Sequence, residues 1–165
     1  MHSNNDRIDD LLADWAEERP DLKNDALSIA LRIQTLAKSF AEFVNDDLSM
    51  FDLEWWEYDV LSALRRRGSP FQLAATEIAE DTMLSAGAMT NRIDRLRDRG
   101  LVERVEDPAD RRRVLVRLTR EGLRLIDRAT EARFQSAESA LKDLTANQRE
   151  QLARLLRRLT VSHSG

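Results

Sequence analysis

The spacing of apolar residues changes its period once, near Gly100, and this change limits what the chain can fold into. Over residues 84–99 apolar side chains recur at the spacing of an amphipathic helix. Over residues 101–105 and 114–118 they alternate with polar residues, as in strands, and residues 106–113 connect the two. A helix that ends at a glycine and is followed at once by a hairpin is therefore predicted.

Helical patterns cover most of the remaining sequence. We predict helices at residues 6–18, 25–45, 53–67, 74–80 and 120–141, and a last one from the capping box at Thr145–Gln148 to Leu159. Three helices are thus followed by a helix-turn-helix pair, a hairpin and two more helices. Helix, turn, helix and hairpin in immediate succession form the winged helix-turn-helix unit. The predicted fold is therefore mainly α with a small two-stranded β wing.

The predicted organisation is a single domain over residues 1–165, because no linker or repeat interrupts the pattern. Residues 53–119 would form the winged helix-turn-helix region. Residues 1–50 and 120–165 would form a helical dimerisation region built from both termini. The terminal helices carry apolar residues that the small central unit cannot cover, among them Leu123, Ile126, Leu152, Leu155, Leu156 and Leu159. We expect a second copy of the chain to bury them, so a homodimer is predicted.

The composition excludes several classes of function. The chain has no cysteine, and its two histidines, His2 and His163, lie near its ends, so we expect no disulfide, metal, cofactor or histidine base. The sequence has neither a glycine-rich phosphate loop nor a recognisable nucleophile–histidine pair. No apolar run approaches the ~18 residues that span a bilayer, and the polar start is unlike a secretory signal. We therefore expect a cytoplasmic protein that is neither an enzyme nor a membrane protein.

Charge is distributed unevenly along the chain. Residues 92–120 contain ten arginines and six acidic residues, which leaves this segment at +4. Because the whole chain has a formal charge of −4, the remainder carries −8. A basic segment on an acidic body is typical of a protein with one nucleic-acid face, although a solvated surface of mixed charge is the alternative.

Four segments resemble the winged-helix regulators of the MarR family. They are residues 84–96, 100–104, 107–113 and 118–122, in this order. The most specific part is the run from Asp110-Arg111-Arg112 to the Leu-Thr-x-x-Gly that begins the next predicted helix. The resemblance implies a dimeric regulator that binds double-stranded operator DNA.

Two upstream segments are similar to the urate-responsive, PecS-type branch of that family. They are residues 14–22, which include Trp15, and residues 56–61. The branch has an additional N-terminal helix with a tryptophan. Tyr58 and Lys23 depart from its usual pattern, which has phenylalanine and an acidic residue at these positions, and they leave the identity of the ligand open.

The predicted recognition helix has one small, polar face. At about 100° per residue, Met89, Ile93 and Leu96 point toward the core, and Gly87 and Asn91 lie roughly opposite. Small residues let the backbone approach DNA, asparagine can pair with adenine, and arginine can pair with guanine. The predicted DNA contacts of this helix are Ser85, Gly87, Ala88, Thr90, Asn91 and Arg95.

The predicted wing supplies the second DNA contact. The family resemblance implies that an arginine of the Asp110-x-Arg112 motif enters the minor groove, with Asp110 holding it in position. A narrow minor groove concentrates negative potential and attracts arginine. Arg111 and Arg113 would contact phosphates. A solvated charged hairpin is the alternative.

Arg92 lies elsewhere on the recognition helix, only ~65° from the centre of the buried face, and so it needs a partner. Asp59 shares a helix face with Trp55 and Arg66, which suggests a partly buried pocket. The resemblance makes Trp15, Asp59 and Arg92 the ligand site, where an anion would break an Asp59–Arg92 pair. A structural salt bridge, with Trp15 packed at the dimer interface, is the alternative.

We therefore predict a ligand-responsive transcriptional repressor that a small anionic effector releases from a pseudo-palindromic operator. Urate or a related purine is the first expectation for this effector. A small polycarboxylate and a phenolic compound are the alternatives. A protein that keeps the fold but only binds other proteins is the rival function.

Overall fold

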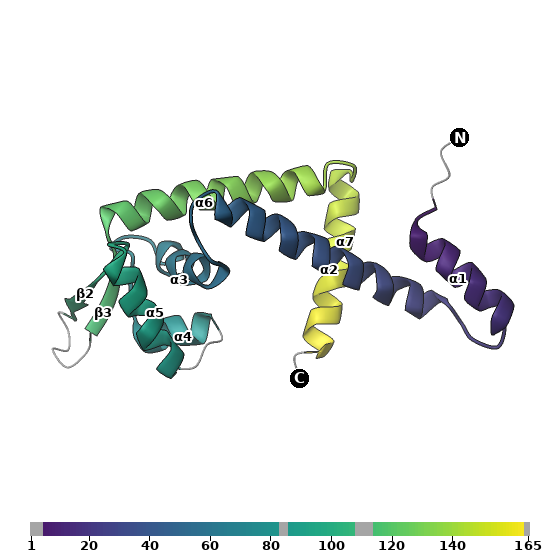
Figure 1. Cartoon of the computed structure of the whole chain (residues 1–165), viewed down its shortest axis with the longest axis horizontal. Coiled ribbons are helices and arrows are strands. Elements are labelled where there is room, and N and C mark those ends of the chain that lie inside the picture. Colours follow the sequence, from purple (N-terminus) through teal and green to yellow (C-terminus); the bar gives the residue numbers. More distant parts are fainter. Residues whose placement is uncertain (1–4, 83–85, 108–113, 164–165) are drawn as a thin grey trace. The chain divides into compact units, whose positions relative to one another are not determined.

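The computed structural model describes residues 5–82, 86–107 and 114–163. The elements in chain order are α1 (Arg7–Glu18), α2 (Asp25–Ser49), α3 (Trp55–Arg66), β1 (Gln72–Ala74), α4 (Ala75–Asp81), α5 (Ala86–Asp98), β2 (Val102–Glu106), β3 (Val114–Leu118), α6 (Arg120–Ala140) and α7 (Ala146–His163) (Figure 1). Helices dominate and the strands form one small antiparallel sheet, which confirms the predicted fold class. The chain divides into two compact units, Met1–Asp46 and Asp47–Gly165.

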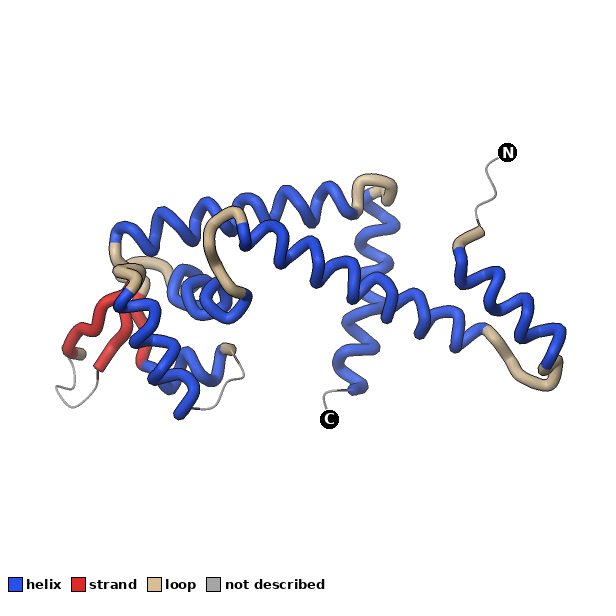
Figure 2. Tube along the Cα trace, in the orientation of Figure 1, coloured by secondary structure: helices blue, strands red, loops and turns tan. Residues whose placement is uncertain are grey.

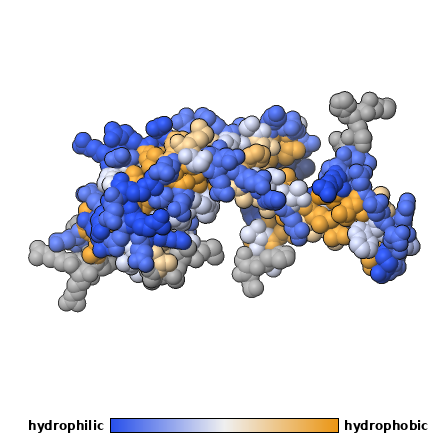
Figure 3. Space-filling view, in the orientation of Figure 1, coloured by the Kyte–Doolittle hydropathy of each residue, from blue (hydrophilic) through white to orange (hydrophobic). Residues whose placement is uncertain are grey.

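In the first unit, polar contacts fasten α1 to α2. Asp6 caps α1 by accepting the backbone N–H groups of Ile8 and Asp9 at 2.9 and 3.1 Å. The Arg32 side chain of α2 forms ion pairs with the carboxylates of Asp6 and Asp9 at 2.9 and 2.7 Å. Apolar residues of this unit also reach the surface (Figure 3), and they include Leu27, Ile29, Leu36 and Phe43.

The second unit contains the hydrophobic core of the winged helix. Its fully buried side chains include Leu61 and Leu64 of α3, Ile78 of α4, Met89, Ile93 and Leu96 of α5, Val102 and Val116 of the sheet, and Ile126 of α6. Burying a side chain of this size contributes about 1.5–3 kcal/mol. The inward face predicted for the recognition helix is thereby confirmed.

The sheet contains one strand more than the sequence predicted. Its order is β1-β3-β2, with Val102 opposite Leu118 in the hairpin and Leu73 opposite Val116 at the other edge (Figure 2). The expectation of two strands was therefore incomplete. β1 has three residues, too few to show an alternating pattern, and α4 follows it directly.

A close backbone contact explains the Leu-Thr-x-x-Gly motif. Thr119 caps α6 by accepting the Gly122 N–H at 3.0 Å, and its hydroxyl donates to the Gly100 carbonyl oxygen at 2.7 Å. A Cβ atom on Gly122 would lie 2.0 Å from the Leu101 carbonyl oxygen. Only glycine therefore lets α6 begin directly against the start of β2.

Only some of the apolar residues that we expected a second copy to bury are exposed at the surface of the chain. Ile126 is fully buried within the chain, in contact with the winged-helix core, so it does not belong to an open stripe. On α7 the stripe stays at the surface, with exposed fractions of 38–56% for Leu152, Leu155, Leu156 and Leu159. No helix in the described part of the chain has the length and apolar character needed to cross a membrane.

Candidate nucleic-acid interface and ligand pocket

Helix α5 turns a polar face outward. Because Met89, Ile93 and Leu96 are buried, Thr90, Asn91 and Arg95 lie at the surface. Ala88 is half-buried, and Gly87 is in the first turn of the helix. Ser85 lies outside the described residues, as do the wing residues Asp110, Arg111, Arg112 and Arg113.

Arg95 is held against the first turn of α3. Its Nη2 lies 3.2 Å from Glu54 Oε1, and its guanidinium carbon lies 4.9 Å from the centre of the Trp56 ring. The indole N–H of Trp56 donates to Glu54 Oε2 at 2.8 Å. Sequence reasoning missed this cluster, because its members come from two helices that only the fold brings together.

Arg92 also lies over Trp56, with 5.2 Å between its guanidinium carbon and the ring centre. Within the described residues it forms no direct ion pair with Asp59, which corrects the predicted contact. Its guanidinium instead lies over the indole face of Trp56, which attracts it. Burial raises the pKa of Asp59, and the charges of Arg66 and Arg92 oppose this shift at longer range while that of Asp81 adds to it.

An ion pair with a buried carboxylate fixes the C-terminal end of α5. Arg99, which follows α5, contacts both carboxylate oxygens of Glu57 at 2.7 and 2.8 Å. Glu57 is 2% exposed and also accepts the Glu54 N–H at 2.9 Å. Arg99 donates in addition to the Asp52 carbonyl oxygen at 2.7 Å. The recognition helix is thus tied to α3 through its second half and through Arg99, the residue after its end.

Other ion pairs hold the base of the wing. Asp94 of α5 contacts Arg104 of β2 at 2.9 Å and Arg97 at 2.8 Å. Across the hairpin, Arg117 pairs with Glu103 at 2.9 Å. Several arginines of the basic segment are therefore neutralised inside the fold, and the segment has less free charge than its composition suggests.

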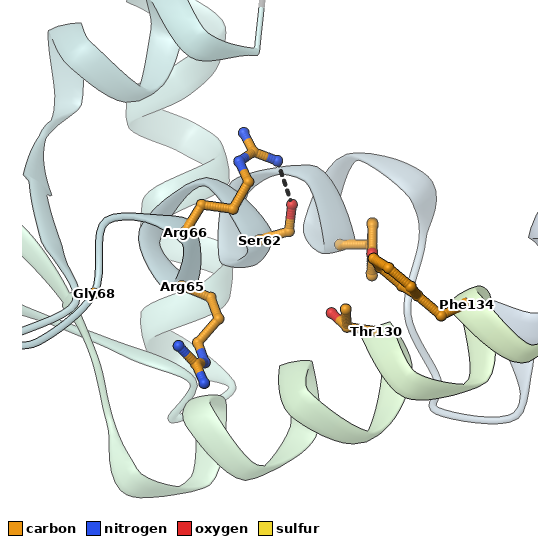
Figure 4. Close-up of a pocket in the computed structure, with 7 residues that line it drawn as sticks. Ser62, Arg65, Arg66, Gly68, Thr130 and Phe134 are labelled. Carbon is orange, nitrogen blue, oxygen red and sulfur yellow. Dashed lines mark hydrogen bonds between the residues drawn. The ribbon is translucent and has the colours of Figure 1, made fainter. Parts of the chain in front are cut away.

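A cavity of about 410 Å³ lies between α3 and α6 (Figure 4). Its lining residues are Tyr58, Ser62, Arg65, Arg66, Gly68, Thr130 and Phe134. Figure 4 shows Ser62, Arg65 and Arg66 on the α3 side and Thr130 and Phe134 on α6. An aromatic ring, hydroxyl groups and guanidinium groups thus meet at one cavity.

Two arginines line this cavity, and they differ in whether an acidic residue pairs with them. Nη1 of Arg66 donates to the neutral Ser62 hydroxyl at 2.8 Å, and none of the described carboxylates lies within ion-pair distance of Arg66. Arg65, by contrast, pairs with Asp127 at 2.6 Å. Arg66 lies seven residues after Asp59 and so on the same helix face, which was visible in the sequence.

The residues predicted to bind ligand are not all at this cavity. Asp59 neighbours it on α3, whereas Arg92 lies on α5 over Trp56. Trp15 belongs to the first unit and is 48% exposed. Sequence reasoning missed Ser62, Thr130 and Phe134 as lining residues, because hydroxyl and aromatic side chains on amphipathic helices carry no distinctive pattern.

Known proteins share this architecture. The model of the MarR family matches residues 51–113, which include α3 to β2. The chain belongs to the MarR family. It is 29% identical over 152 residues to the HTH-type transcriptional regulator PecS of Dickeya dadantii, covering 92% of each chain. It is 32% identical over 108 residues to the transcriptional regulator HosA of Escherichia coli O111:H-, covering 66% of this chain and 78% of HosA.

Two solved structures are similar to this fold. One is a MarR mutant from E. coli complexed with operator DNA, with a TM-score of 0.67, 27% identity, and coverage of 82% of this chain and 96% of that one. The other is Bordetella bronchiseptica BpsR, whose DNA binding is regulated by 6-hydroxynicotinic acid, with a TM-score of 0.65, 25% identity, and coverage of 80% and 92%. This MarR-family chain is accordingly a winged-helix transcriptional regulator, not an enzyme.

Proposed function

We propose that this MarR-family protein is a repressor that binds a pseudo-palindromic operator as a homodimer and releases it when a small anionic effector binds. The observation that carries the proposal is the outward face of α5. Thr90, Asn91 and Arg95 are exposed on this face, while the apolar side chains on the inward face of the same helix are fully buried. A rigid helix with exposed polar side chains is what readout of base edges in the major groove requires.

DNA recognition is assigned to α5 and the wing. Asn91 would pair with adenine and Arg95 with guanine, while Gly87 and Ala88 permit close approach. Contacts from Ser85, Thr90 and the wing residues Asp110, Arg111, Arg112 and Arg113 would position the protein on the duplex. Duplex binding measured at two salt concentrations tests this, since phosphate contacts make affinity fall with salt. Absence of duplex binding would favour a protein-interaction function.

The dimer is proposed from the open leucine stripe of α7. Apolar residues that gather on one face of a helix mark an interaction surface. A two-fold dimer would place its two recognition helices about one turn of DNA apart, which corresponds to half-sites about 10 bp apart. Sedimentation at micromolar concentration tests the dimer.

The effector is proposed to bind near Asp59. The cavity of about 410 Å³ has the size of a small-ligand site, and its lining includes the Phe134 ring and Arg66, which forms no ion pair with a described carboxylate. A small planar anion fits this chemistry, and the regulation of BpsR by 6-hydroxynicotinic acid is in keeping with it. Urate or a related purine is the first candidate, with polycarboxylates and phenolic compounds as alternatives. Trp15, Asp59 and Arg92 remain the proposed ligand contacts.

The experiment that tests the effector is a titration of the protein–DNA complex with urate, xanthine, hypoxanthine, aconitate and 6-hydroxynicotinate. Asp59→Ala and Arg92→Ala should keep measurable DNA binding and lose release by the active compound. An effector shifts the equilibrium only through its different affinity for the two states, and these changes would remove that difference. An unchanged response in both variants would refute the ligand site and leave the DNA-binding assignment standing.

A further inference from the structure

One indole ring in the first turn of α3 lies against two arginines of the recognition helix. Arg92 and Arg95 are three residues apart on α5, and their guanidinium carbons lie 5.2 and 4.9 Å from the centre of the Trp56 ring. An aromatic face attracts a guanidinium and limits its rotamers. Trp56 therefore orients two arginine side chains of α5, of which Arg95 is on the outward face, without belonging to that helix.

Glu54 adds a second, opposing contact. One of its carboxylate oxygens accepts the Trp56 indole N–H at 2.8 Å, and the other lies 3.2 Å from Nη2 of Arg95. The indole thus fixes the carboxylate, and the carboxylate holds the arginine. The side chains of Arg95 and Glu54 are 62% and 61% exposed, so their ion pair is accessible to a competing group.

An exposed ion pair of this kind is weak and can be exchanged. Losing such a pair changes an equilibrium constant by about fivefold at most, whereas an arginine with two hydrogen bonds to a guanine edge discriminates against the wrong base by about fivefold to a hundredfold. A guanidinium has five N–H donors. Arg95 can therefore leave Glu54 while its planar face remains on Trp56.

We propose that Glu54 and Trp56 are positioning residues for DNA recognition, and that they act in opposite directions. Trp56 orients Arg95 before DNA arrives and so lowers the entropic cost of binding. Glu54 competes with DNA for the same guanidinium and so weakens binding. This inference rests on the proposed function, in which α5 reads DNA.

The opposite signs distinguish positioning from a merely structural role. Glu54→Gln keeps the size of the side chain and removes its charge, and it should tighten DNA binding about two- to fivefold, the range expected for losing an exposed ion pair. Trp56→Leu removes the aromatic face and should weaken binding by a similar factor. Trp56→Phe keeps an aromatic face and should bind more tightly than Trp56→Leu. Two residues with a structural role alone would both weaken binding when changed.

A matched control separates this contact from general charge effects. Asp98 lies on α5, is exposed and pairs with Arg97 at 3.1 Å, so Asp98→Asn removes the same charge without touching Arg95. It should tighten binding less than Glu54→Gln does. In an Arg95→Ala background the advantage of Glu54→Gln over Asp98→Asn should disappear, because the competing contact no longer exists.

The experiment uses the full chain and the duplex that the wild-type protein enriches from a random-sequence pool. Affinities are measured for the single and double variants, with thermal unfolding as a check that each is folded. A gain for Glu54→Gln that disappears with Arg95→Ala, together with a loss for Trp56→Leu, supports the inference. A gain no larger than that of Asp98→Asn, or one that persists without Arg95, overturns it while DNA binding stands. Failure of the wild-type protein to enrich or bind any duplex overturns both this inference and the proposed function.

Discussion

Helices α5 and α7 have the same kind of sequence and different surroundings. Each combines an apolar stripe with several arginines, but Met89, Ile93 and Leu96 of α5 are buried within the chain, whereas the leucines of α7 remain at the surface. An amphipathic pattern predicts that a helix will be covered on one face. It does not say whether the cover comes from the same chain.

This difference separates two levels of the protein's organisation. The α5 region is complete within one chain, because core packing and the Glu57–Arg99 pair fix its position. The α7 region depends, in our proposal, on a second copy. A destabilising mutation in the α5 region should therefore have the same effect at any protein concentration. The effect of a mutation in the leucine stripe of α7 should depend on protein concentration.

The largest effect is expected for Glu57→Ala. This change leaves Arg99 without its buried carboxylate and should lower the free energy of unfolding by about 3 kcal/mol. The measurement is urea denaturation at two protein concentrations, and the loss should be the same at both. Glu103→Gln, which breaks the exposed pair with Arg117, serves as the control and should cost less than about 1 kcal/mol. Equal losses for the two variants would contradict the role of burial.

Leu155→Asp tests the proposed dimer interface on α7. A charge in the leucine stripe should weaken the proposed dimer by about 2 kcal/mol or more, because the interface would have to desolvate it. Sedimentation across a concentration series measures the shift. Val161→Asp is the matched control, since Val161 is exposed on the opposite face of α7. A dimer equally sensitive to both changes would show that the stripe is not the interface.

Asn91→Ala addresses the polar face of α5. It should lower the discrimination between the preferred duplex and one with a single changed adenine by about 1–3 kcal/mol, with little effect on folding because Asn91 is exposed. Competition binding with the two duplexes gives the value. Arg112→Ala should instead weaken binding to all duplexes and reduce its salt dependence. Unchanged discrimination by Asn91→Ala would mean that another face of α5 reads the bases.

Local patterns made the helices and the core of the recognition helix predictable. The spacing of Met89, Ile93 and Leu96 and the cap at Thr119 need no information beyond their neighbours in sequence. β1 was not predictable, because its three residues form a strand only through their pairing with β3. The assignment of Ile126 to an open stripe was wrong because helical spacing cannot distinguish cover by the same chain from cover by another.

The candidate sites were predictable to a smaller extent. The outward position of Asn91 follows from the helical wheel. The Glu57–Arg99 pair joins residues 42 positions apart, and the cluster of Glu54, Trp56 and Arg95 depends on how α3 packs near α5. Asp59 is a partly buried carboxylate, as the sequence suggested, but it forms no direct ion pair with Arg92, whose guanidinium lies over Trp56.

The smallest effect is expected for Asp59→Asn, and its sign follows from the raised pKa. Because the folded protein binds this proton more tightly than the unfolded chain, ionised Asp59 disfavours the fold. Its cost develops as pH rises from the ordinary pKa of an aspartate, about 4, through the raised pKa of the folded state. Asparagine carries no charge at any pH, so the variant should be slightly more stable than wild type at pH 7. The difference should shrink as pH falls toward about 4, where the wild-type carboxyl takes up its proton. Urea denaturation of both proteins at several pH values measures it. Asp143→Asn, at an exposed carboxyl between α6 and α7, is the control for the loss of one negative charge at the surface. A variant less stable than wild type at pH 7 would mean that Arg66 and Arg92 outweigh burial, and that Asp59 is stabilised as an anion in the way the α5 ion pairs are.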